Sequence, residues 1–452
     1  TGVHIDFIHP VAGQVSEQFN LLIASGEYPD LIEYGWDTYL GGPRSAIDDK
    51  VIVPIDDYLE YAPNFKKALE SSELADAYRR GSTLDDGTHY GFTTLNLGNF
   101  RTFGGPMIRR DWLDELGLEI PETINDWTEV LRAFKQKKGA VTPLTGSEFP
   151  ENFVGAFKIS SDFYADGDTV KYGPAQPEYK EFLAVMRQWY EEGLIDKDIL
   201  TNKSTIVDAK MTDGSAGALV HGYIGATLGR YMAQKSVEDP EYDLTGAPYP
   251  VLKKGEVNSF ARIEPDVVPS RTLAISTACK DPVTAGKWGD FWYSNEGYKL
   301  MNFGIEGESY NMVDGKPVYT DVILKNPDGL SINETLQLYC RATSPAPGFK
   351  QAPEYLEQYY QYPQQIESLK LWENGTDAAR KTLLSGLQPT SEENDKISSL
   401  RTDLTTYVKE KRWAFITGKE SLDNYDSFVQ ELKSKFGLDE CLSIIQAQYD
   451  RY

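Results

Sequence analysis

The sequence predicts an α/β fold divided into two lobes, and three observations support this prediction. The chain has 452 residues, more than one hydrophobic core usually holds, so two lobes of roughly 200 residues each are expected. Hydrophobic residues make up 40% of the chain, which is enough to fill two cores. Apolar residues at helical spacing alternate with short apolar runs along the sequence, and this alternation is typical of an α/β protein.

The composition excludes several classes of partner and site. Sixty-nine acidic and 45 basic residues give a formal net charge of −24. Because contacts with phosphate groups need clustered Lys and Arg, no nucleic-acid partner is expected. Cys279, Cys340 and Cys441 are widely spaced, which predicts neither a zinc site nor a disulfide framework. We interpret them as buried free thiols, with a single disulfide left open as the alternative.

No apolar run approaches the ~20 residues of a transmembrane helix, so no direct membrane segment is expected. No signal peptide stands at Thr1 either.

The first candidate binding region follows a helix and a strand near the start of the chain. Apolar residues at helical spacing predict a helix from Glu17 to Ala24, and a turn then leads into a short buried strand at Leu31–Ile32. A polar and aromatic cluster follows this strand, at the kind of position where open α/β sheets bind ligands. Trp36, Asp37 and Tyr39 are therefore candidate binding residues. The alternative for Trp36 and Tyr39 is that they are ordinary half-buried aromatic residues.

Two more groups of polar or aromatic residues follow predicted strands. The loop after an Asp-Gly hairpin turn carries Asn96 and Arg101, whose polar side chains suit the hydroxyl groups of a sugar. The run Gly217–Gly225 predicts a buried strand whose glycines allow a sharp exit, with His221 and Tyr223 at its end. A lone histidine is more often structural, so both interpretations of His221 stay open.

The remaining periodicity predicts further elements. A half-buried strand is expected from Val3 to Phe7 because apolar and polar residues alternate there. Further helices are expected at 63–80, from a cap at Thr123 or Asp126 to about Lys137, and at 177–193, 353–372 and 397–415; a small strand pair is expected at 163–164 and 169–172.

Five segments, in order along the chain, carry a family resemblance: ASGEYPDLI (24–32), MIRRDWLDELGL (107–118), GALVHGYIG (217–225), TGAPYPVL (245–252) and NFGIEGESY (302–310). Together they resemble the extracellular solute-binding proteins of carbohydrate ABC importers. Within these maltose-binding-protein-like receptors, the chain resembles the larger oligosaccharide-type lipoproteins common in Gram-positive bacteria.

The resemblance implies a type II periplasmic-binding-protein-like fold, with a central cleft and a hinge of crossing strands. It implies a first lobe of residues 1–105 and 268–335, lacking its first strand and helix, and a second lobe of 106–267 and 336–452. The implied function is to capture a sugar or an oligosaccharide in the cleft and deliver it to the permease subunits of an ABC transporter. A monomer is expected, either lipid-anchored on the extracellular face through a residue upstream of Thr1 or periplasmic.

The resemblance also implies ligand-binding residues. Tyr223 stands where these receptors carry an aromatic residue that stacks on a ring of the ligand. Glu306 and Tyr310 are expected in the pocket, and the alternative for Glu306 is a bracing role at the hinge. Arg341 and Phe349 bound the proline-rich segment RATSPAPGF, where the last crossover is expected close to the cleft.

No metal and no cofactor is expected. Related alginate and oligosaccharide receptors carry a calcium loop with alternating Asp and Asn near the end of the helix that is predicted here to end at about Lys137. The corresponding stretch of this chain, KQKKGA (135–140), offers no carboxylate for calcium and lacks the alternating Asp and Asn.

Two other functions stay open at this point. One is a receptor for a non-sugar polar solute or a peptide. The other is a glycoside-processing enzyme, because an acidic, aromatic-rich chain is compatible with a carboxylate pair. No such pair is identified, and the sequence contains no nucleophile elbow, P-loop, dinucleotide fingerprint or H-E-x-x-H helix. We therefore expect no enzyme activity.

Overall fold

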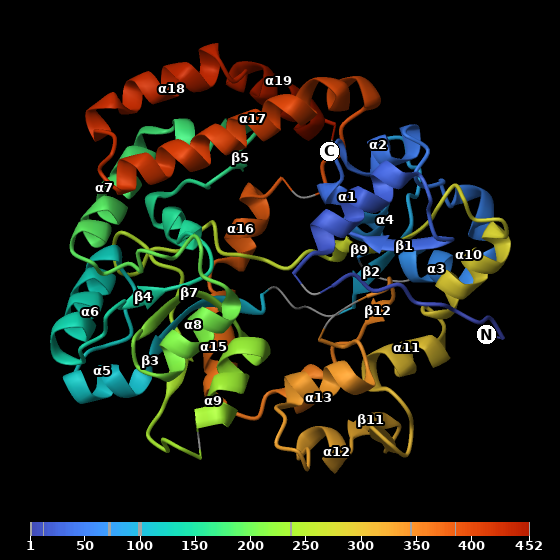
Figure 1. Cartoon of the computed structure of the whole chain (residues 1–452), viewed down its shortest axis with the longest axis horizontal. Coiled ribbons are helices and arrows are strands. Elements are labelled where there is room, and N and C mark those ends of the chain that lie inside the picture. Colours follow the sequence, from blue (N-terminus) through green and yellow to red (C-terminus); the bar gives the residue numbers. More distant parts are fainter. Residues whose placement is uncertain are drawn as a thin grey trace.

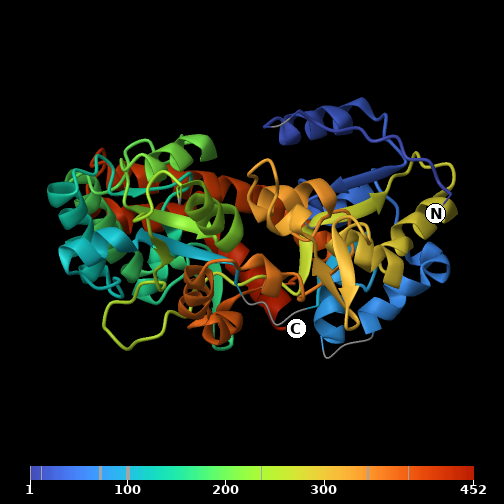
Figure 2. The same ribbon diagram turned by 90° about the horizontal axis from the view of Figure 1, so that it is seen from below.

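The computed structural model describes residues 2–11, 13–70, 74–97, 102–235, 237–343, 346–384 and 386–451. Two bodies lie side by side in it, each built on a four-stranded sheet covered by helices (Figures 1 and 2). The predicted two-lobe α/β fold is confirmed.

The sheet of the first lobe has the strand order β1-β9-β2-β12. The long strand β9 (Val267–Ile275) pairs antiparallel with β1 (Leu31–Tyr34) on one side and with β2 (Phe92–Asn96) on the other. The short strand β12 (Lys350–Gln351) extends the sheet by pairing parallel with β2. All five residues of β2 are buried, as expected for a strand covered on both faces.

The sheet of the second lobe has the order β4-β7-β3-β8. Its central strands, β3 (Gly104–Arg109) and β7 (Ala218–Tyr223), pair antiparallel. The edge strand β4 (Leu144–Thr145) runs parallel to β7, whereas β8 (Leu244–Gly246) is antiparallel to β3. β7 leaves the sheet at Tyr223, so the residues at its carboxyl end lie where a ligand site is expected.

The helices cover both sheets and connect them. The first lobe contains α1 (Val15–Ser25), α2 (Gly42–Asp48), α3 (Pro63–Glu70), α4 (Ala75–Ser82), α10 (Pro282–Phe291) and α11 (Asn295–Phe303). Elsewhere the chain forms α5 (Arg110–Leu116), α6 (Ile124–Lys137), α7 (Pro177–Glu191), α8 (Ser204–Thr212), α9 (Arg230–Lys235), α12 (Asp321–Leu324), α13 (Ile332–Tyr339), α14 (Leu356–Tyr359), α15 (Pro363–Glu373), α16 (Thr376–Thr382), α17 (Ser391–Ile416), α18 (Tyr425–Ser434) and α19 (Leu438–Tyr449). Two hairpins complete the fold, β5 (Phe163–Asp166) with β6 (Thr169–Tyr172) and β10 (Tyr310–Val313) with β11 (Lys316–Tyr319).

Local sequence explains most of these boundaries. Helix α6 begins with a capping box, in which Thr123 and Asp126 each accept a hydrogen bond from the other's backbone N–H. Helix α7 begins at Pro177 and is followed by Gly193 in the left-handed conformation, as predicted from the sequence. The continuous helix expected at 353–372 is instead divided into α14 and α15, because Pro363 starts a new helix rather than continuing one.

The strand expected at Val3–Phe7 is not formed. Residues 2–11 contain no strand, and the side chains of Phe7 and Ile8 are 69% and 83% exposed. Alternation predicts which side chains face a core, but a strand also needs a partner for its backbone groups. Within the described residues β1, the edge strand of the first sheet, pairs with β9 alone.

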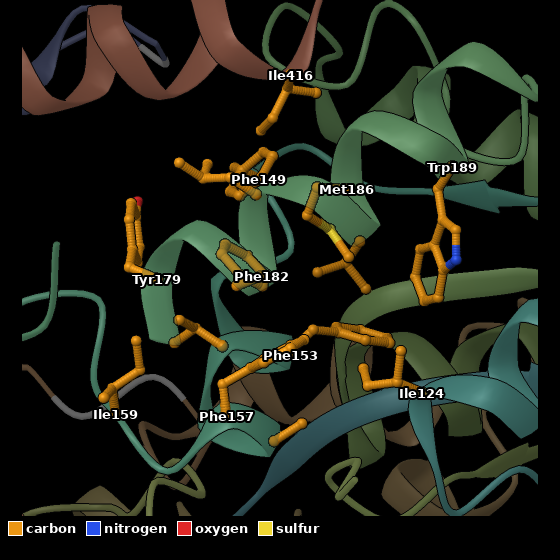
Figure 3. Close-up of a cluster of buried hydrophobic side chains, with 14 of the residues drawn as sticks. Ile124, Phe149, Phe153, Phe157, Ile159, Tyr179, Phe182, Met186, Trp189 and Ile416 are labelled. Carbon is orange, nitrogen blue, oxygen red and sulfur yellow. The ribbon is translucent and has the colours of Figure 1, made fainter. Parts of the chain in front are cut away.

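Aromatic side chains fill the largest core, which lies in the second lobe between α6, α7 and α17. Figure 3 shows part of this core, where Phe153 lies between the helices and Phe149 lies near Ile416 of α17. The indole of Trp189 packs edge-on against Phe153, and its Nε1–H donates a 2.9 Å hydrogen bond to Thr128. Trp112 and Trp127 are also buried.

Candidate functional site

A pocket of about 380 Å³ lies at the carboxyl end of β7 in the second lobe. Its walls come from the loop at 146–148, from α8, from the end of β7 and the turn after it, and from Arg262. This volume is within the usual range for small-molecule sites, which is roughly 300–1,000 Å³. The lining is a mixture of small, hydroxyl-bearing, aromatic and charged side chains.

The turn after β7 forms the floor of this pocket. Residues Ile224–Gly229 form one turn of π-helix, labelled η5, in which the Oγ1 of Thr227 accepts a 3.1 Å hydrogen bond from the Tyr223 N–H. Gly225 is required here because a Cβ at this position would lie 1.4 Å from the hydroxyl of Tyr359. Gln365 also donates to the carbonyl of Ile224 at 2.9 Å, so the turn is anchored from α15.

His221, Tyr223 and Arg262 form a connected cluster on one wall. Arg262 Nη2 donates to the Tyr223 hydroxyl at 2.9 Å, and Nη1 lies 3.3 Å from Nε2 of His221. The rings of His221 and Tyr223 meet edge to face, with centroids 5.0 Å apart. Gly104 permits this arrangement, because a Cβ there would lie 2.9 Å from the imidazole.

The imidazole of His221 is neutral. Burial, and then the positive charge of Arg262, lower the pKa of His221 to about 3. Because a guanidinium can only donate, Nε2 of His221 is the acceptor and the ring proton is on Nδ1. The amide nitrogen Nδ2 of Asn152 lies 3.4 Å from Nδ1, and because it too is a donor, this contact is not a hydrogen bond in that tautomer. His221 therefore orients Arg262 without contributing a charge.

A buried carboxylate holds the loop and helix at one edge of the pocket. Asp196 is 1% exposed, and its Oδ2 accepts hydrogen bonds from Thr145 at 2.6 Å, Asn202 at 2.8 Å and Lys210 at 2.6 Å. Burial alone would raise the pKa of Asp196, but these three donors lower it below its ordinary value. Asn202 also donates to the carbonyl of Gly146, so the network ties β4 and α8 to the pocket edge.

The segment after Arg262 connects this wall to the other lobe. Arg262 precedes the start of β9, the central strand of the first sheet, by five residues. Asn96 is 4% exposed, and its Nδ2 donates to the carbonyl of Pro265 at 2.6 Å while its backbone N–H donates to that of Asp266 at 2.9 Å. Asn96 was predicted as a binding residue, and the structure places its side chain on this connecting segment.

The predicted residues after β1 have different environments. Trp36 is fully buried, and its indole N–H donates to the carbonyl of Thr272 at 3.2 Å. The hydroxyl of Tyr39 donates to Asp49 at 2.9 Å; burial, and then this carboxylate, raise the pKa of Tyr39 to about 12. Asp37 is exposed, and desolvation by the surrounding protein raises its pKa.

A second charged group lies near the end of β1. Desolvation raises the pKa of Glu33, while the positive charges of Arg271 and Arg341 act in the opposite direction. Arg341, another predicted site residue, is therefore close to Glu33 although it follows α13. The structure thus brings Asp37 and Arg341 to the same lobe as Glu33, away from the residues that line the β7 pocket.

The other predicted residues are dispersed. Phe349 is fully buried, and its carbonyl accepts from the Leu95 N–H of β2. Tyr310 is 3% exposed at the start of β10, while Glu306 is exposed and forms a bridge with it. Arg101 lies outside the described residues, as do Asn99 and Phe100 of the same loop.

Sequence analysis missed several groups that line the β7 pocket, above all Arg230, Asp208 and Arg262. Arg262 lies in an irregular segment with no periodicity, and its partners are 39 and 41 residues away. Thr227 follows Ala226 and carries no sequence signal of its role. Only the contacts of the folded chain show that these residues belong together.

The described residues contain no candidate metal centre and no candidate membrane span. No group of three or more His, Cys, Asp or Glu side chains in the described parts of the chain could hold a metal ion. Among the helices that the structure describes, none has the length and apolar character required to cross a bilayer. All three cysteines are free, with Cys340 and Cys441 buried and Cys279 partly exposed.

Comparison with solved structures supports the fold. The alginate-binding protein AlgQ2, solved without calcium ion, aligns with a TM-score of 0.81 and 26% sequence identity, over 96% of this chain and 89% of AlgQ2. The two-lobe architecture is therefore shared with an experimentally determined binding protein.

Sequence comparison identifies the family. The chain is 26% identical over 498 aligned residues to the fructooligosaccharide ABC transporter substrate-binding protein FusA of Streptococcus pneumoniae, an alignment that covers 100% of this chain and 85% of FusA. It is 24% identical over 356 residues to lipoprotein LipO of Bacillus subtilis, covering 74% of this chain and 67% of LipO. The profile of bacterial extracellular solute-binding proteins matches residues 1–299. This chain belongs to the family of bacterial extracellular solute-binding proteins.

Proposed function

We propose that the protein is the substrate-binding component of an ABC transporter, which captures a sugar or an oligosaccharide between its lobes and delivers it to the membrane permease. Membership of the solute-binding family supports capture and delivery. FusA is named for fructooligosaccharides and AlgQ2 for alginate, so both relatives are named for glycans. The observation in this chain that carries the proposal is the exposed tyrosine ring beside hydrogen-bonding groups in the β7 pocket.

The chemistry of that wall suits a sugar. The side chain of Tyr223 belongs to a residue that is 41% exposed, and an aromatic ring can pack on the C–H face of a pyranose or furanose. Arg262 fixes the Tyr223 hydroxyl and so orients the ring. Ser147, Glu148 and Ser204 line the same pocket and offer partners to sugar hydroxyls, which both donate and accept.

We propose that the first lobe completes the site on closure. Asp37 and Arg341 are exposed on that lobe, and Asp37 has the raised pKa of a carboxyl group partly removed from water. Trp36, Phe349 and Tyr310 are buried in this conformation. Their role in the proposal is to support the residues that touch the ligand. Hinge closure between two lobes would bring the two faces together around the ligand.

The division into lobes is part of the proposal. We place residues 1–105 and 268–335 in the first lobe and 106–267 and 336–452 in the second, with one adjustment. Lys350 and Gln351 form β12 and pair with β2, and Arg341 lies close to Glu33, so these residues belong with the first lobe.

We also propose that the protein works as a monomer outside the cytoplasmic membrane. It is either held there by a lipid on a residue upstream of Thr1 or free in a periplasm. The family description as extracellular, and the name of the relative LipO as a lipoprotein, support this location.

We propose that the protein catalyses no reaction and uses no cofactor. The lowered pKa of His221 in the pocket wall keeps the imidazole neutral, and its ring nitrogens face Arg262 and Asn152. A histidine held in this way is poorly suited to accept a proton.

A thermal-shift screen against mono- and oligosaccharides, followed by calorimetry, tests the proposal. A sugar present at 100 times its Kd should stabilise the folded state by roughly 2.7 kcal/mol. Tyr223→Ala should abolish most of this stabilisation, whereas Tyr223→Phe keeps the ring and should retain most of it. Products detected by chromatography would instead establish an enzyme. Stabilisation by peptides or other polar solutes, with no response to any sugar, would overturn the sugar assignment.

A further inference from the structure

The charges that line the β7 pocket cancel. Among the lining residues, Arg230 and Arg262 are positive and Glu148 and Asp208 are negative, which gives two charges of each sign. No lysine contributes to this lining. A site for a polyanionic glycan would instead need an excess of positive charge to replace the hydration of each ligand carboxylate.

Arg230 is neutralised from within the protein. Its Nη2 donates to Asp208 Oδ1 at 2.8 Å, and its Nε donates to the carbonyl of Ala226 at 2.8 Å. The same oxygen of Asp208 accepts from the hydroxyl of Tyr231 at 2.5 Å. The Arg230 guanidinium therefore stabilises the turn after β7 and is already paired with the carboxylate of Asp208.

Arg262 is also engaged within the pocket wall. Its hydrogen bonds to Tyr223 and His221 use both terminal nitrogens, and its Nε lies 3.8 Å from the Glu264 carboxylate. A ligand carboxylate approaching Arg262 would meet Glu264 beside it and Glu148 on the same lining. Repulsion between like charges at a partly desolvated site opposes such an approach.

Charges of both signs also lie near the end of β1 in the first lobe. The positive charges of Arg271 and Arg341 act on Glu33, and Asp37 is a second carboxyl group just after this strand. Both carboxyl groups have raised pKa values because the surrounding protein desolvates them. The formal charge of the whole chain, −24, adds a long-range repulsion for polyanions.

We infer that the glycan bound by this protein is uncharged, and that the site discriminates against oligosaccharides of uronic acids. This inference rests on the proposed function as a sugar receptor. An uncharged sugar presents hydroxyl groups, each of which can accept from an arginine and donate to a carboxylate. Pocket walls that carry both arginines and carboxylates match these hydroxyl groups. The carboxylate of a uronic acid would find no arginine there that lacks a counter-ion within the protein.

Calorimetry with charge-matched ligands tests the inference. The purified chain is titrated with neutral trisaccharides (kestose, maltotriose and galactotriose) and with trigalacturonate and an alginate trisaccharide, at low and at high NaCl. We expect at least one neutral glycan to bind about tenfold or more tightly than either uronate. Its Kd should change little with salt, because screening acts on charged ligands.

A matched variant separates charge from shape. Glu148→Gln keeps hydrogen-bonding groups but leaves the lining with one net positive charge. We expect the preference of this variant for the neutral glycan over trigalacturonate, measured as the ratio of the two Kd values, to fall at least threefold below that of the parent. An unchanged ratio would show that charge does not govern the selection and would overturn the inference.

The failures of the two proposals are distinguishable. Tighter binding of a uronate than of any neutral sugar, weakening as salt is added, would overturn the inference and leave the sugar receptor intact. If neither the neutral nor the uronate sugars give a heat of binding and a non-sugar solute does, the receptor proposal is overturned and the inference with it.

Discussion

Asn394 of α17 and Ser45 of α2 are joined by a hydrogen bond of 2.8 Å, although 349 residues separate them in sequence. Asn394 is 5% exposed, and its Oδ1 accepts from Ser398 on the next turn of the helix at 3.0 Å. Helix α17 contributes Leu404 and Phe415 to the core of the second lobe, whereas α2 belongs to the first. Figure 1 shows α17 extending from α18 and α7 toward α2. This contact therefore joins the two lobes.

Removal of this contact should loosen the free protein. Asn394→Ala is expected to increase the radius of gyration of the unliganded chain, measured by small-angle X-ray scattering, and to cost about 1 kcal/mol of stability. Ser45→Ala should have a similar effect on scattering. Ser398→Ala is the control, because it removes the intrahelical partner and keeps the contact between lobes. Identical scattering from all three variants would contradict the assignment.

The depressed pKa of His221 predicts a specific dependence of stability on pH. The unfolded histidine takes up a proton below about pH 6.5, whereas the folded one stays neutral down to about pH 3. The unfolded state binds more protons in this window, so the contribution of His221 to stability is lost as the pH falls, by about 1.4 kcal/mol for each pH unit below 6.5.

Chemical denaturation of the parent and of His221→Gln at pH 7.5, 6.0 and 5.0 checks this expectation. The difference between the two proteins should shrink or reverse at low pH, because glutamine does not titrate. His4→Gln is the matched control, since that side chain is 87% exposed. If both variants follow the parent at every pH, His221 is not buried in its neutral form.

The positive charge of Arg262 contributes to the low pKa of His221, so its removal should raise that pKa. Arg262→Ala is expected to shift the NMR titration of the His221 ring toward its ordinary range. The same variant should weaken sugar binding by about tenfold, because Tyr223 loses its charged donor. Arg262→Lys keeps the charge but not the planar fork, so it should keep the low pKa and still weaken binding. A titration unchanged in Arg262→Ala would contradict the proposed coupling.

The hydrogen bonds around Asp196 should be important for stability rather than for ligand contact. Asp196→Ala leaves Lys210 without its buried counter-ion and is expected to destabilise the fold by about 3 kcal/mol, measured by urea denaturation. Asp198→Ala, at an exposed neighbour, should change stability little. An equal decrease in the free energy of unfolding in both variants would show that the hydrogen bonds of Asp196 contribute no more to stability than an exposed aspartate does.

Several elements could be predicted from the sequence because they depend on local pattern. The spacing of Phe19, Leu22 and Ile23 predicts α1, and a buried run followed by glycines places His221 and Tyr223 at the end of β7. Arg262 could not be found in this way, since its role depends on partners about 40 residues away. Aromatic residues after a strand are also ambiguous: Trp36 turns inward to Thr272, while Tyr223 faces the pocket.

The four residues between Arg262 and β9 have a consequence for how ligand binding can act on the first lobe. One end of this segment forms a wall of the pocket, and the other is clamped by Asn96 before it enters the opposite sheet. On the proposed function, a ligand that displaces Arg262 would act on a segment that continues directly into the central strand of the first sheet. In this proposal, ligand binding is coupled to the movement of the lobes through the continuous main chain. No chain of side-chain contacts is needed between the pocket and the first lobe.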